Sequence, residues 1–198
     1  MPGNLLPQRV PKGIADPMGR AVARVGITPN MVSVTGFGGN VACAWLIATD
    51  RLLLAGIVYL FFSALDLVDG AVARATGQAT PYGAVLDAVL DRASEAIVLA
   101  GCAWYFGERE EWWQVGFTYA AIFGSIAVSY VRARAEVEGL QMREGLFRRQ
   151  ERVVVLGLGL LLNGVAAALA IAIVILAVLA NVTALQRAWL GGRQLRRD

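Results

Sequence analysis

Residues 66–91 read DLVDGAVARATGQATPYGAVLDAVLD. This stretch places Asp66 and Asp69 near the end of one apolar run, and Asp87 and Asp91 near the start of the next. The polar turn between the two runs is short, so we expect two antiparallel helices that lie side by side. Because a carboxylate inside a bilayer is costly, four of them at this point indicate a function.

The chain around this stretch is strongly apolar. It has 198 residues, of which 57% are hydrophobic and 17% are charged. A soluble domain is less apolar and lacks such long apolar runs, and about 20 apolar residues cross a bilayer. We therefore expect an all-α integral membrane protein with six transmembrane helices. The predicted spans are 31–49, 52–74, 83–106, 112–135, 152–163 and 164–186.

Two features of these spans need separate mention. Thr28-Pro29 is a helix-start signal just before the first span. Only Asn163-Gly164 separates the last two spans, so a single long helix is the alternative there.

The two ends of the chain carry much of its positive charge. Residues 1–26 predict an amphipathic helix lying on an anionic membrane face, and they lack the long apolar core of a signal peptide. We expect one membrane domain over 1–198, with a six-helix bundle at 27–190 and a basic cytoplasmic tail at 191–198. Arginine is concentrated on one side of the predicted spans, which places both termini and the aspartates on the cytoplasmic side of the cell membrane.

Some kinds of site are excluded by composition. The chain has no histidine, which removes Ser-His-Asp catalysis and histidine-ligated zinc. Cys43 and Cys102 lie inside apolar runs and give no case for a disulfide framework or a metal site.

The four aspartates have the spacing of one shared site. Residues three or four apart share a helix face, so the two pairs can converge near the inner membrane face. Converging carboxylates repel one another unless they are protonated or cations bridge them. An all-oxygen set selects a hard divalent ion, Mg²⁺, Mn²⁺ or Ca²⁺, and four carboxylates can hold more than one. We expect two ions, Mg²⁺ or Mn²⁺. Gly70 and Ala73 leave room beside this face, and Arg74 is placed to hold a phosphate. The alternative is that the carboxylates only pair with arginines and stabilise the bundle.

This stretch resembles the motif of the CDP-alcohol phosphotransferase family, D-x2-D-G-x2-A-R-x8-G-x3-D-x3-D. Each of its eight fixed positions is present here, the glycine of the second half being Gly83. The resemblance implies transfer of a phosphatidyl-type group from a CDP-linked lipid to an alcohol, with release of CMP, by a homodimer. It also implies a role for each motif residue. Metal would be bound by Asp66, Asp69, Asp87 and Asp91, and Asp91 would also be the general base. The CDP-lipid would be contacted by Asp66, Asp69, Gly70, Ala73 and Arg74, with help from Thr80 and Tyr82.

A second polar region indicates the acceptor. Ser129 and Arg132 share a helix face, Arg152 opens the fifth span, and Arg193 lies beyond the sixth. Several arginines around one cavity predict an acceptor with its own phosphate. The region resembles the phosphatidylinositol-phosphate synthase branch, which implies CDP-diacylglycerol as donor and inositol 1-phosphate as acceptor. Glycerol 3-phosphate is the rival acceptor, and the other arginines are expected to set topology or bind anionic lipids: Arg148, Arg149, Arg196 and Arg197.

A cation transporter is the alternative from another class. Carboxylates inside a membrane can bind a transported ion, and such a protein would place them near mid-membrane and have no nucleotide affinity. The position of Gly70, Ala73 and Arg74 beside a cytoplasmic turn favours phosphotransfer instead.

Overall fold

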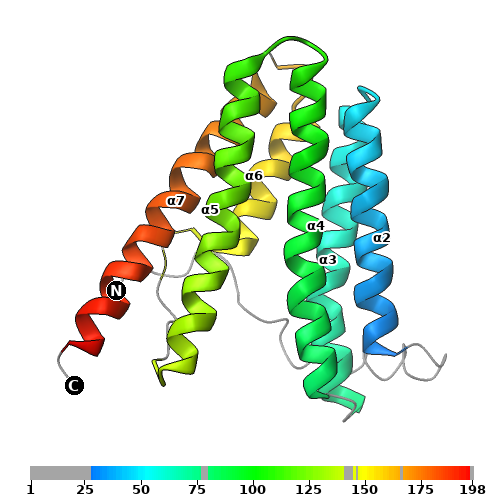
Figure 1. Ribbon diagram of the computed structural model, residues 1–198. Helices are drawn as coiled ribbons and strands as arrows, with labels where there is room; N and C mark the ends of the chain where they lie inside the picture. The colour runs from blue at the N-terminus through cyan, green and yellow to red at the C-terminus, as the bar shows by residue number, and fades with distance from the viewer. Residues whose placement is uncertain (1–27, 77–79, 141–144, 146, 166, 197–198) are drawn as a thin grey trace.

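The computed structural model describes residues 28–76, 80–140, 145, 147–165 and 167–196, except for the side chains of 66–76. The amphipathic segment predicted at 1–26 and the last two residues lie outside this description. The described residues form α-helices and no strand, as Figure 1 shows. The helices are α2 (Pro29–Ala48), α3 (Leu52–Thr76), α4 (Pro81–Gly107), α5 (Trp112–Val137), α6 (Arg149–Leu161) and α7 (Ala168–Leu195).

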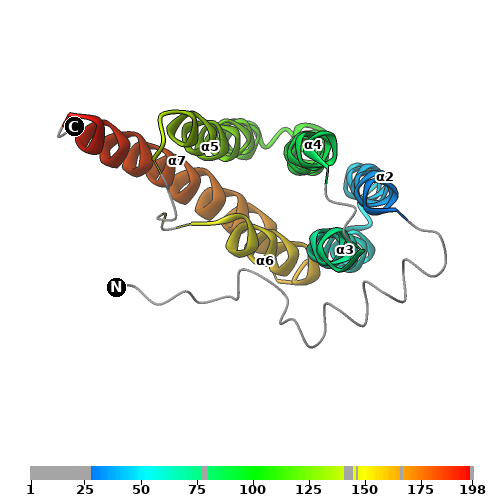
Figure 2. The ribbon, with the colours of Figure 1, turned by 90° about the horizontal axis from the view of Figure 1, so that it is seen from below.

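The helices form a closed ring. Over the described residues each helix packs against two others, in the order α2, α3, α6, α7, α5, α4 and back to α2. Seen from below, the helices follow this order around the molecule (Figure 2). The predicted side-by-side packing of α3 and α4 is therefore not seen over their described residues. The two helices run antiparallel, but α2 packs against both of them and so completes that part of the ring.

The ring is apolar inside and outside over much of its length. Buried side chains from different helices fill its interior, among them Ile47, Leu99, Cys102, Phe106, Leu160 and Ile173. Large apolar side chains also cover the outer surface, among them Trp45, Phe61, Trp113, Phe123 and Leu185. An apolar exterior of this extent suits lipid and not water. The protein is thus an all-α membrane protein.

Not every helix has the character of a full span. Among the described residues, α2, α5 and α7 are long and apolar enough to cross a membrane. The first half of α4 carries several charged residues, and α6 has 13 residues. At about 1.5 Å per residue, α6 is about 20 Å long and shorter than the hydrocarbon core of roughly 30 Å. Crossing of the membrane by all six helices remains a prediction.

Two helix starts have the same chemistry. The Thr28 hydroxyl accepts a hydrogen bond from the backbone N–H of Met31 at 3.3 Å, which confirms the predicted helix start. The Thr80 hydroxyl likewise accepts one from Gly83 N at 3.0 Å. In both cases a proline follows the threonine, where its missing N–H costs nothing. These caps set where α2 and α4 begin.

The last two helices are separate, which confirms the prediction of a break at Asn163-Gly164. Helix α6 ends at Leu161, and α7 starts after Ala167, which has a positive φ of 63°. Helix α7 continues through Leu195, beyond the predicted end of the span at 186. The first part of the segment expected to be a tail is thus helical.

Glycine lets α2 and α4 approach closely. A Cβ at Gly101 would lie 2.7 Å from the carbonyl oxygen of Ala44, whereas a Cβ at Gly116 would meet nothing within 4 Å. We expect Gly101→Ala to lower the free energy of unfolding by about 1–3 kcal/mol, because backbone must move. The matched change Gly116→Ala should raise it by about 0.5–1 kcal/mol through helix propensity. Thermal unfolding in detergent measures both, and equal effects of the two changes would contradict this packing.

Candidate active site

The motif residues lie where α3 ends and α4 begins, at the bottom of Figure 1. Helix α3 continues to Thr76, so Asp66 and Asp69 lie on its last turns with helical i,i+3 spacing. Gly70, Ala73 and Arg74 follow on the same helix. The side chains of these five residues lie outside the description, so their contacts stay predictions.

Asp87 and Asp91 lie on one face of α4. Both are half-buried. Asp91 Oδ1 is 2.9 Å from Nη1 of Arg149, the first residue of α6. Over the described residues no group of three or more metal-binding side chains is found, and only these two of the four predicted aspartates have described side chains. The two carboxylates supply oxygen donors of the kind that Mg²⁺ and Mn²⁺ prefer.

The first turn of α4 has a tight contact at the motif glycine. A Cβ at Gly83 would lie 3.0 Å from Oδ1 of Asn30 on α2 and 3.1 Å from the Thr80 hydroxyl. The glycine therefore lets α4 start close to α2. Thr80 is the cap of α4, and Tyr82 is 70% exposed, so its ring is accessible at this end of the molecule.

Arg152 has a different environment from the one expected for an open phosphate-binding residue. Its side chain is 4% exposed, and Nε and Nη2 donate to the two carboxylate oxygens of Glu95 at 2.6 and 2.9 Å. Nη1 donates to the carbonyl oxygen of Phe147 at 3.4 Å. Ser125 of α5 also hydrogen-bonds to Glu95. The predicted phosphate ligand is thus half of a buried ion pair between α4 and α6.

Arg187 of α7 marks a positively charged corner. It is 6% exposed, and its Nη1 donates to the carbonyl oxygen of Val128 on α5 at 3.1 Å. Gly145 lies against the guanidinium, because a Cβ there would be 2.7 Å from Nη2. The charges that act on Arg187 come mostly from other arginines: Arg132, Arg148 and Arg152, with Glu136 opposing them. We call Arg132, Arg148, Arg152 and Arg187 the arginine corner. Such a corner attracts anions.

The remaining predicted acceptor residues have local partners. Ser129 is half-buried on α5. Arg132 is exposed, and its Nε is 2.9 Å from Glu136 Oε1. The Arg193 guanidinium lies 5.5 Å from the ring centroid of Trp189 on α7. Arg132 and Arg152, two of the predicted acceptor residues, are among the charges that act on Arg187.

The sequence interpretation missed three side chains of this region. Glu95 lies four residues after Asp91, so the helix period would have placed it on the same stripe. Arg149 was assigned to topology, but it pairs with Asp91. Arg187 was not singled out, because no local pattern distinguishes it from the other arginines of the last helix.

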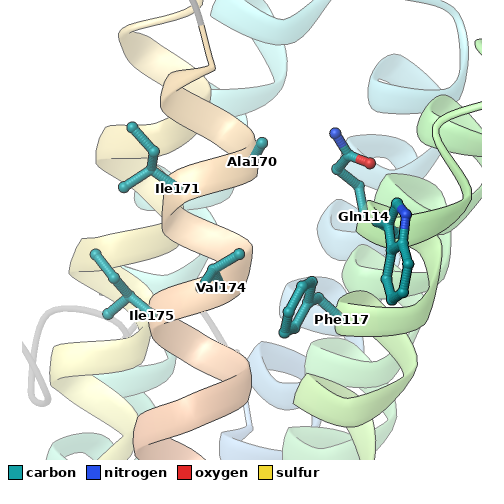
Figure 3. Close-up of a pocket in the computed structure, with 7 residues that line it drawn as sticks. Gln114, Phe117, Ala170, Ile171, Val174 and Ile175 are labelled. Carbon is teal, nitrogen blue, oxygen red and sulfur yellow. The ribbon is translucent and has the colours of Figure 1, made fainter.

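An apolar pocket of about 310 Å³ lies elsewhere, between the first turns of α5 and α7. Ala170 and Val174 of α7 point toward Gln114 and Phe117 of α5 (Figure 3). The other lining residues are Trp113, Ile171 and Ile175, so none of the lining side chains is charged. The pocket lies toward the other end of the ring from Asp87 and Asp91 and is not the candidate active site.

Comparison with known proteins decides the family. The model of the CDP-alcohol phosphatidyltransferase family matches residues 26–189. The chain belongs to this family. The match covers all the described helices of this CDP-alcohol phosphatidyltransferase except the end of α7.

Named relatives of this CDP-alcohol phosphatidyltransferase are synthases of phosphatidylinositol phosphate and archaetidylinositol phosphate. The phosphatidylinositol phosphate synthase of Mycobacteroides abscessus is 37% identical over 76% of this chain and 70% of its own length. The archaetidylinositol phosphate synthase of Pyrococcus horikoshii is 34% identical over 90% of each chain.

Solved structures give the same similarity. The phosphatidylinositol phosphate synthase of Mycobacterium tuberculosis with CDP-DAG bound has a TM-score of 0.82 and 33% identity, over 90% of this chain and 94% of that one. Its complex with manganese and citrate has a TM-score of 0.80 and 33% identity, over 89% and 88%.

Proposed function

We propose that this CDP-alcohol phosphatidyltransferase transfers the phosphatidyl group of CDP-diacylglycerol to a hydroxyl of inositol 1-phosphate. The acceptor oxygen forms a bond to the phosphorus of the phosphatidyl group. The bond from that phosphorus to the bridging oxygen of the pyrophosphate breaks, and CMP leaves with that oxygen. The observation that carries the proposal is the likeness of this chain, over 90% of its length, to a phosphatidylinositol phosphate synthase with CDP-DAG bound.

The donor would bind at the turn between α3 and α4. Its contacts there are proposed from the family motif: Asp66, Asp69, Gly70, Ala73, Arg74, Thr80 and Tyr82. The close approach of α4 to α2 at Gly83 and the exposure of Tyr82 support an accessible site at this turn.

Metal would be held by the four motif aspartates. Asp66, Asp69, Asp87 and Asp91 are proposed ligands of two Mg²⁺ or Mn²⁺ ions, which when bound would neutralise charge on the pyrophosphate. Manganese in the mycobacterial structure supports a divalent ion in this family. Asp91 is the proposed general base, taking the proton of the attacking hydroxyl. Its carboxylate lies 2.9 Å from Arg149 of α6, the helix that also carries the proposed acceptor residue Arg152.

The acceptor phosphate would bind at the arginine corner. The proposed contacts are Ser129, Arg132, Arg152 and Arg193, and we add Arg187 because it is buried among the charges of Arg132 and Arg152. A guanidinium binds phosphate with two parallel hydrogen bonds. The corner and Asp91 are linked through α6, because Arg149 and Arg152 share a helix face.

The orientation of the protein in the membrane is proposed from the distribution of its arginines. Both termini, the aspartates and the arginine corner would face the cytoplasm, since arginine collects at that end of the ring. The chain would act as one domain in the cell membrane and as a homodimer.

Acceptor competition tests this proposal most directly. Purified protein with CDP-diacylglycerol and Mg²⁺ or Mn²⁺ should release CMP, and inositol 1-phosphate should be used in preference to equal glycerol 3-phosphate. Chelation of the metal should stop the reaction. Preference for glycerol 3-phosphate would make the protein a phosphatidylglycerophosphate synthase. An absence of CMP release with every phosphorylated polyol would favour the cation transporter.

A further inference from the structure

The ion pair of Glu95 with Arg152 spans the interior of the ring. Helices α4 and α6 are not neighbours in the ring, and over the described residues they do not pack against each other. Two pairs of long side chains nevertheless join them: Arg149 with Asp91 and Arg152 with Glu95. The two acidic residues are four apart on α4, and the two arginines are three apart on α6. The two ion pairs therefore lie one helical turn apart and connect α4 to α6 side by side.

Stability alone does not explain why the buried position is occupied by the Glu95–Arg152 ion pair. Replacing a buried ion pair by apolar side chains is often neutral or stabilising, because both charges lose their hydration. The same ring fills its interior with apolar residues such as Leu99 and Leu160, so apolar packing suits this fold. Glu95 is 13% exposed in its side chain and Arg152 is 4% exposed, so both charges are largely removed from water.

The contacts around the pair fix the orientation of the guanidinium. Glu95 engages one edge through Nε and Nη2, and Phe147 accepts from Nη1. Glu95 is itself held by Ser125 of the neighbouring helix α5. A fork of this kind leaves little freedom of rotation. The charge of Arg152 is thereby held where it acts on Arg187.

We propose that Glu95 is a positioning residue that holds Arg152 in place for the acceptor phosphate. Glu95 touches no reacting atom and acts through Arg152 alone. The proposal rests on the proposed function, because it requires the arginine corner to bind that phosphate. Glutamine at position 95 would keep the length of the side chain but present one acceptor and one NH₂ group to the guanidinium, so the fork could not form.

Turnover of Glu95→Gln tests this role. We expect the KM for inositol 1-phosphate to rise about tenfold to a hundredfold, since small misplacements of a binding group have effects of this size. The KM for CDP-diacylglycerol should stay within about twofold of wild type, and Glu95→Asp should recover part of the loss. Glu138→Gln is the control for loss of a glutamate that pairs with arginine, because Glu138 lies 2.6 Å from Arg134 in an exposed pair away from Arg152. That control should behave as wild type.

A double variant shows whether Glu95 acts through Arg152. Arg152→Met should raise the same KM, and Glu95→Gln should add nothing further in that background. This double variant carries no buried charge at either position, so it should fold even if Glu95→Gln alone unfolds.

Three results would overturn the inference. A lower melting temperature with an unshifted acceptor KM in Glu95→Gln would leave the pair a purely structural link. A further loss on adding Glu95→Gln to Arg152→Met would give Glu95 a role of its own. Wild-type protein that releases no CMP with inositol 1-phosphate would remove the proposed function itself, which is distinguishable because the first two results require normal wild-type turnover.

Discussion

Asn at position 91 is expected to abolish turnover and leave the ring folded. An amide carries no negative charge, so it cannot take the proton of the acceptor hydroxyl or bind a divalent ion well. We expect kcat to fall by about 10³-fold or more, since a general base alone contributes about 10²–10⁴-fold. The Asp91–Arg149 pair is partly exposed, so its loss should lower the melting temperature only slightly. Release of CMP and thermal unfolding of Asp91→Asn measure the two effects.

Asp50 provides the matched control for this change. It lies in the turn between α2 and α3 and pairs with Arg109 at 2.8 Å, so Asp50→Asn also removes a carboxylate that pairs with arginine. Its positive φ of 64° is one that asparagine tolerates well. Asp50→Asn should keep normal turnover. Full turnover in Asp91→Asn would remove the proposed role of Asp91, and equal losses in both variants would point to general damage.

The helices could be predicted because their signals are local. Apolar runs and threonine-proline caps such as Thr28-Pro29 act within a few residues of each helix end. Helix α7 runs past its predicted end because the expected boundary was set by hydrophobicity, while helix continues through the polar residues up to Leu195. A change from apolar to polar residues ends a membrane span, but it does not by itself end a helix.

The closure of the ring could not be predicted in the same way. A short turn between α3 and α4 predicts neighbours, but packing between helices depends on where close approach is possible. Gly101 lets α4 approach the backbone of α2 at Ala44, and this contact draws α4 to α2. Such pairings join residues far apart in sequence, and no local pattern encodes them.

The candidate site likewise has a part that local sequence spacing predicts and a part that depends on contacts between distant residues. The aspartate spacing follows from the helix period and was visible in the sequence, whereas Glu95 and Arg152 are 57 residues apart and meet only across the ring. The sequence indicated Arg152 as a basic residue near a helix start, but it gave no sign of its burial. Arg187 is similar, because its importance comes from the arginines of α5 and α6 that surround it.

Loss of the Arg187 guanidinium is expected to weaken acceptor binding. Hydrogen bonds to charged groups contribute about 1.5–3 kcal/mol, so Arg187→Met should raise the KM for inositol 1-phosphate by about tenfold to a hundredfold. The KM for CDP-diacylglycerol should change little, because the donor site is proposed at the other helix pair, α3 and α4. Initial rates of CMP release at varied concentrations of each substrate measure this.

Two further variants separate binding from folding at Arg187. Gly145→Ala keeps the arginine but places a Cβ 2.7 Å from its Nη2, so the guanidinium must shift and the same KM should rise to a smaller extent. Arg134→Met is the matched control, because Arg134 is exposed and pairs with Glu138 along α5. It should leave both KM values unchanged. An unchanged acceptor KM in Arg187→Met, with folded protein, would show that Arg187 has a structural role, to which its hydrogen bond to the Val128 carbonyl of α5 contributes.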